Sequence, residues 1–121
     1  MRIAPLGVLL MLLCGPARAD LQLTCTFSVD VFPNNDQEVL AAEIIPTAQG
    51  DRPCASIQDG SLRATPPECP PNYAQYGKVS DAYLGQTEVT RSVRGRQIVV
   101  TRSFREARRN CLAPSNPGTK R

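Results

Sequence analysis

The clearest pattern in the chain is a strict alternation of apolar and polar residues from Leu21 to Val31. Apolar side chains occupy every odd position, and polar side chains occupy every even one. Because successive side chains of a β-strand point to opposite faces, this spacing predicts a strand with one buried face. Cys25 falls on the apolar face, where it can connect the strand to a distant part of the chain.

A second alternating stretch runs from Glu88 to Phe104 and is interrupted by Arg94-Gly95. Two such residues between alternating segments predict a β-hairpin. The expected partners across it are Val89 with Val100, Arg91 with Ile98 and Val93 with Arg96. On this register one face is apolar apart from two arginines, and a one-residue slip would reverse the faces. That face holds Val89, Val93, Ile98, Val100 and Phe104, with Arg91 and Arg102 expected at its rim. The opposite face is mostly polar and includes Ser103.

The segment from Asp36 to Ile45 fits two structures. Asn35 followed by Glu38 matches a helix capping box, and Pro46 would end the helix. The same segment could be a strand returning beside the first one, because residues 33–36 are rich in turn formers. We favour a short helix and keep the strand as the alternative.

The middle of the chain is expected to be mainly loop. Asp59-Gly60 is typical of a hairpin turn between short strands. From Thr65 to Asn72 four of the eight residues are proline, which fixes φ and donates no backbone hydrogen bond. This composition predicts an extended, exposed connection. The stretch that follows contains Tyr73, Tyr76 and Tyr83 and is also interpreted mostly as loop.

The first nineteen residues have the pattern of an export signal. Arg2 precedes an apolar run from Leu6 to Cys14, and Ala17-Arg18-Ala19 provides the small residues that signal peptidase recognises. We therefore predict cleavage before Asp20 and a periplasmic or secreted protein. A lipoprotein anchored at Cys14 is the alternative, although a large residue precedes this cysteine. No later segment of the sequence is apolar and long enough to cross a membrane.

Removing residues 1–19 leaves a chain of one-domain length. We expect a β-rich domain over 20–112 and a disordered tail over 113–121, which is rich in proline, glycine and charge. The predicted fold is mainly β. We expect a small antiparallel sheet or sandwich stapled by two disulfides, with one short helix as an option.

Four cysteines remain in the mature chain, namely Cys25, Cys54, Cys69 and Cys111. Zinc sites place two ligands two to four residues apart, and these cysteines are much more widely spaced, so disulfides are expected instead. We favour a nested pattern, Cys25 with Cys111 and Cys54 with Cys69, because terminal strands of small antiparallel domains are often neighbours. The sequential pattern, Cys25 with Cys54 and Cys69 with Cys111, is the alternative, and the crossed pattern is the least favoured.

Charge is divided along the mature chain. Ten acidic residues oppose three basic ones from Asp20 to Thr90, and nine basic residues oppose Glu106 alone from Arg91 onward. The arginines could bind an anionic partner, or they could pair with the acidic half of the chain. The candidate binding residues on the hairpin and beyond are Arg91, Arg94, Arg96, Arg102 and Arg105. Without interleaved aromatic residues, nucleic acid is not an expected partner.

The proline-rich loop around Cys69 is a second candidate contact surface. A loop stiffened by proline and a disulfide loses little entropy on binding, and Tyr73 and Tyr76 beside it are of a type that recognition surfaces favour. The alternative is that the loop only connects two parts of the chain and that the tyrosines cover the core.

The chain contains no histidine, which removes the commonest general base and the commonest metal ligand. We therefore expect a non-enzymatic protein with no metal or cofactor. The favoured function is an exported binding protein, such as an inhibitor or immunity-type partner of another protein. The alternatives are a binder of lipopolysaccharide or acidic glycan through the arginine hairpin, and a small histidine-free hydrolase.

Overall fold

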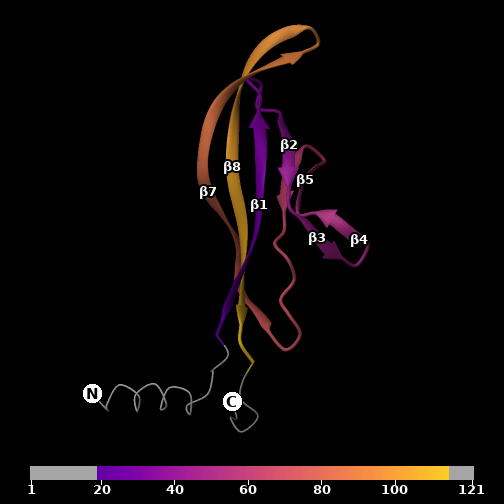
Figure 1. Ribbon diagram of the computed structural model, residues 1–121, viewed down its shortest axis with the longest axis vertical. Helices are drawn as coiled ribbons and strands as arrows, with labels where there is room; N and C mark the ends of the chain where they lie inside the picture. Colours follow the sequence, from indigo (N-terminus) through magenta and orange to yellow (C-terminus); the bar gives the residue numbers. More distant parts are fainter. Residues whose placement is uncertain (1–18, 115–121) are drawn as a thin grey trace, which may run out of the picture.

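The computed structural model describes residues 19–114 (Figure 1). The predicted signal peptide before Ala19, the alternative lipid site at Cys14 and the tail beyond Pro114 lie outside the described residues. Within 19–114 all regular structure is β-strand, so the mainly β, antiparallel prediction is confirmed. The strands are β1 (Leu21–Val31), β2 (Gln37–Ala42), β3 (Ile44–Thr47), β4 (Gly50–Pro53), β5 (Ala55–Gln58), β6 (Ser61–Ala64), β7 (Ala74–Val93) and β8 (Arg96–Leu112).

One long sheet forms the body of the molecule. Its strand order is β2-β1-β8-β7, and every neighbouring pair is antiparallel. The hairpins β3–β4 and β5–β6 are separate two-stranded sheets that lie on the β2 side of the long sheet (Figure 1). The β7–β8 turn stands at one end of the long axis, and β1 begins near the other (Figure 1).

The strand predicted from alternation is confirmed as β1, the central strand beside both β2 and β8. Its odd positions Cys25, Phe27 and Val29 are buried. They pack with buried apolar residues from the small hairpins, from the link between these hairpins and from β8, which are Ile45, Cys54, Ala55 and Ala107. The core therefore lies between one face of the long sheet and the two small hairpins.

The predicted hairpin is confirmed with its predicted register, including Val89 opposite Val100 and Val93 opposite Arg96. Arg94 and Gly95 have φ values of 53° and 77° at the turn. Two positive φ angles define the type I′ turn, whose twist matches that of the flanking strands. Glycine adopts this conformation readily, whereas arginine does so at a steric cost.

The prediction of one continuous apolar face on β8 is wrong beyond Arg102. Val100 is buried, but Phe104 on the same face is 40% exposed, and Ser103 on the opposite face is buried. The small hairpins cover the face that carries Ser103 and Ala107. The buried side of the strand therefore changes along its length.

The favoured disulfide pattern is wrong, because the bonds join Cys25 with Cys54 and Cys69 with Cys111. The terminal strands are neighbours, as expected, but Leu21 lies opposite Cys111 and Cys25 lies opposite Ala107. Cys25 and Cys111 are therefore offset by four residues, about 13 Å along the strands. A disulfide requires Cα atoms within about 7 Å.

Two further predictions are corrected. The favoured helix over 36–45 is absent, because β2 and β3 occupy this segment and β2 pairs with β1. Backbone pairing of this segment with β1 favours a strand more than the local capping signal favours a helix. The stretch with Tyr76 and Tyr83 belongs to β7 rather than to a loop. Its pairing with β8 continues through two register irregularities, one between Tyr76 and Ser80 and one between Tyr83 and Gly85.

Candidate functional site

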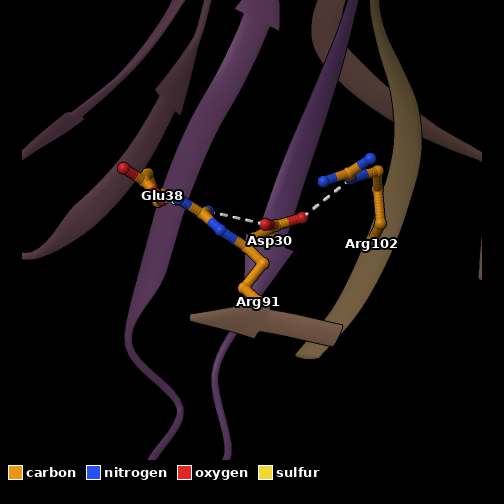
Figure 2. Close-up of polar contacts among 4 residues, drawn as sticks. All are labelled: Asp30, Glu38, Arg91 and Arg102. Atoms are coloured by element: carbon orange, nitrogen blue, oxygen red, sulfur yellow. Dashed lines mark hydrogen bonds and ion pairs between the residues drawn. The ribbon is translucent and has the colours of Figure 1, made fainter. Parts of the chain in front are cut away.

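Four charged side chains meet where the bent β7–β8 hairpin approaches β1 (Figure 2). Asp30 has no exposed surface, and it lies opposite Glu38 on β2 and opposite Arg102 on β8. Arg102 Nε donates to Asp30 Oδ1 at 3.0 Å, and Arg91 Nη1 donates to Oδ2 at 2.8 Å. Arg91 Nη1 also lies 2.5 Å from Glu38 Oε1. We call these four residues the Asp30 cluster.

Electrostatics favour the charged form of Asp30. Burial alone would raise the pKa of Asp30, but the hydrogen bonds from Arg102 and Arg91, with their positive charges, outweigh it and lower the pKa below its ordinary value. The hydrogen bond to Asp30 raises the pKa of Arg91, and Glu38 adds to this effect. Asp30 is therefore an ionised acceptor with an arginine on each oxygen.

The Asp30 cluster holds the hairpin against β1. Arg91 comes from β7, two strands away from Asp30, and its guanidinium also lies 5.7 Å from the ring centre of Phe32. A cation over an aromatic face adds a modest attraction. These contacts favour a role in shaping the sheet over a role in catalysis, because both oxygens of Asp30 are already bonded.

The predicted arginine surface is distributed along the hairpin rather than gathered in one patch. Arg91 and Arg102 belong to the Asp30 cluster, Arg94 and Arg96 are exposed at the turn, and Arg105 is half-buried on β8. Two further arginines make internal contacts. Arg108 Nε donates to Glu106 Oε1 at 2.6 Å, and Arg109 is bonded to the proline-rich loop.

The proline-rich loop is held at two points. Cys69 is bonded to Cys111, and the buried Arg109 donates from Nε to the carbonyl oxygen of Pro67 at 3.0 Å and from Nη1 to Gln75 Oε1. Sequence reasoning had given the Cys69–Cys111 bond only as part of the alternative pattern, and it had not assigned the contacts of Arg109. Tyr73 is half-buried at the end of the loop, whereas Tyr76 is exposed on β7. The structure therefore does not bring the tyrosines together with the arginines at the hairpin turn.

The outer edge of β7 is a feature that the sequence analysis missed. β7 is twenty residues long, and among the described residues no strand pairs with its outer edge. From Ala74 to Asp81 its side chains are exposed on both faces. Farther along, Tyr83 and Leu84 are 58% and 54% exposed. A long, exposed edge strand is a template for pairing with another chain.

A hollow of about 820 Å³ lies between the two small hairpins and the proline-rich loop. Its wall includes Arg63 and Glu68, with hydroxyl and amide groups such as Thr47 and Gln58. A second hollow, about 430 Å³, crosses the uncovered sheet face beside Phe104.

Residues 19–114 contain no gathering of three acidic, cysteine or histidine side chains that could hold a metal ion. No helix in that range is long and apolar enough to span a membrane. No protein-family model, curated protein or solved structure matches the chain.

Proposed function

We propose that this protein is an exported, non-enzymatic binding protein that takes an extended segment of another protein onto the outer edge of β7. The observation that carries the proposal is the unpaired edge of a twenty-residue strand within the described part of the chain. Its outward N–H and C=O groups are chemically complementary to the backbone of one more strand. Neighbouring apolar side chains, including Tyr76, Val79, Tyr83 and Leu84, would add side-chain contacts.

Export is part of the same proposal. The two disulfides are compatible with an oxidising compartment. We propose that residues 1–19 are removed before Asp20, which places the protein in the periplasm or the medium. Intact-mass and amino-terminal analysis of the exported protein tests this point. A protein that starts at Asp20 without lipid supports it, and an acylated Cys14 contradicts it.

A partner at the edge is favoured over an anionic glycan on the arginine hairpin. Arg91 and Arg102 already have acidic partners within the domain, and Arg108 and Arg109 also make internal contacts. A hydrolase has less support, because the sequence lacks histidine and the buried carboxylate of Asp30 is bonded to two arginines.

The binding experiment captures partners from cell envelope and medium with the oxidised protein as bait. Two adjacent variants, Gln86→Pro and Thr87→Pro, lie in the regular pairing from Gly85 to Val93. Successive backbone N–H groups of a strand point to opposite edges, so only one of these prolines removes a bond to β8. Amide exchange identifies which variant retains its pairing with β8.

The variant that keeps native stability is the test, and its neighbour is the control for loss of the β7–β8 pairing. The proposal predicts that the wild-type protein recovers a stoichiometric protein partner and that the stable variant does not. Recovery of the same partner by the stable variant contradicts binding at this edge. Recovery of no protein from either fraction by the wild-type bait contradicts the binding function itself.

A further inference from the structure

A separate surface lies at the end of the molecule where the β1–β2 and β7–β8 turns meet. A hollow of about 490 Å³ there has an apolar wall formed by Phe32, Pro33, Val93 and Ile98. Arg94 and Arg96 stand at the same hollow. We call these six residues the tip surface. The hollow is lined mainly by carbon, yet it has two cations beside it.

The two tip arginines differ from the other arginines of the hairpin. Arg91 and Arg102 form ion pairs within the Asp30 cluster. Arg94 and Arg96, in contrast, are exposed and make no ion pair or side-chain hydrogen bond with the residues the structure describes. Asp36 also lines the hollow, but its carboxylate accepts a hydrogen bond of 2.9 Å from the side chain of Asn34. The tip surface and Asp36 together carry a net positive charge.

The backbone at the turn favours other residues than arginine. Arg94 has φ 53°, a conformation that asparagine, aspartate and glycine adopt more readily. The turn would form at least as well without this side chain. Arg94 therefore places a positive charge on the tip surface at a small cost in the stability of the turn.

We propose that the tip surface binds an anionic lipid membrane, with lipid phosphate beside Arg94 and Arg96 and adjoining hydrocarbon against the apolar wall. Arginine pairs well with phosphate, and basic and apolar residues placed together match the boundary between headgroup and acyl chain. The apolar wall offers few hydrogen-bonding groups to a sugar polymer. The β7–β8 turn, which carries part of the tip surface, forms one end of the molecule, opposite the end where β1 starts (Figure 1). A flat membrane can therefore reach it. This inference does not depend on the β7 edge.

The experiment compares two double variants with the same change in charge. Arg94→Asn with Arg96→Gln removes the tip cations, and asparagine suits the turn. Arg52→Gln with Arg63→Gln is the matched control, because these two arginines are exposed on the small hairpins. Binding of the oxidised protein to vesicles of phosphatidylglycerol mixed with phosphatidylcholine, and to phosphatidylcholine alone, is measured by co-sedimentation over a range of salt.

The wild-type protein and the control variant are expected to bind the anionic vesicles alike, with affinity that falls as salt rises. The tip variant is expected to bind about 25-fold more weakly, from about fivefold for each arginine near an anionic surface. Equal losses in the two variants, or equal binding to neutral vesicles, overturn the proposal. Retention on heparin without vesicle binding also overturns it and indicates a polymer ligand. Displacement of the protein from vesicles by glycerol phosphate alone overturns it too and indicates a small phosphate ligand. Capture of a partner at the β7 edge is expected to be unchanged in the tip variant.

Discussion

Substitution of Asp30 by asparagine tests how strongly the Asp30 cluster holds the hairpin to β1. The change keeps the size of the side chain and removes its charge. Asp30 is fully buried and accepts one hydrogen bond from Arg91 and one from Arg102. The amide group keeps one acceptor oxygen but turns the other position into a donor facing a guanidinium.

The magnitude follows from these contacts. A hydrogen bond to a charged group contributes about 1.5–3 kcal/mol, and removing one partner of a buried ion pair costs about 3–5 kcal/mol. Arg91 and Arg102 each keep 32% of their side-chain surface exposed, so both recover hydration when the carboxylate is lost. We therefore expect Asp30→Asn to lower the free energy of unfolding by about 2–3 kcal/mol.

Urea unfolding with both disulfides intact provides the assay. The chain has no tryptophan, so far-UV circular dichroism or tyrosine fluorescence follows the transition. Asp51→Asn is the matched control, because Asp51 is exposed on β4 and its side chain makes no hydrogen bond or ion pair within residues 19–114. It is expected to change stability by less than about 0.5 kcal/mol. Equal unfolding midpoints for the two variants would refute the stabilising role of the cluster.

Three further predictions concern the same fold. Because the folded-state pKa of Asp30 lies below its ordinary value of 3.8, its stabilising effect is complete above that value and is lost as pH falls through the folded-state pKa. The difference in unfolding free energy between wild type and Asp30→Asn should therefore shrink in acid, and a constant difference contradicts this. Arg94→Asn should stabilise the protein by about 0.5–1 kcal/mol, because asparagine tolerates the left-handed conformation, and equal or lower stability in urea contradicts it. Tryptic digestion without reduction should yield peptide 64–78 joined to peptide 110–120, with Cys25 and Cys54 bonded inside peptide 20–63. A single product linking all three peptides contradicts this pairing, because both the nested and the crossed patterns would give it.

The features that sequence reasoning predicted correctly are those encoded over short distances. The alternation from Leu21 to Val31 depends only on the geometry of one strand, and Arg94-Gly95 between alternating segments defines both the turn and the register beside it. Each of these two patterns can be recognised from a few neighbouring residues. They were sufficient to predict a mainly β, antiparallel fold.

The features that were missed depend on which segments meet in space. The disulfide pairing depends on a four-residue offset between β1 and β8, and no local pattern reports that offset. Asp30 lies on the polar face of its strand, so its burial could be known only once the bent hairpin placed Arg91 beside it. β7 extends back to Ala74 because β8 pairs with it, although glycine and serine weaken the strand signal there.

Hydrogen exchange of the β7 amides is the most direct test of the central claim, which is that the outer edge of this strand is open and accepts a partner strand. In the isolated protein, alternate amides between Gly85 and Val93 should exchange rapidly, because only every second N–H bonds to β8. On addition of the captured partner, these rapidly exchanging amides should become protected. Exchange rates along β7 that stay unchanged when the partner binds would contradict the account.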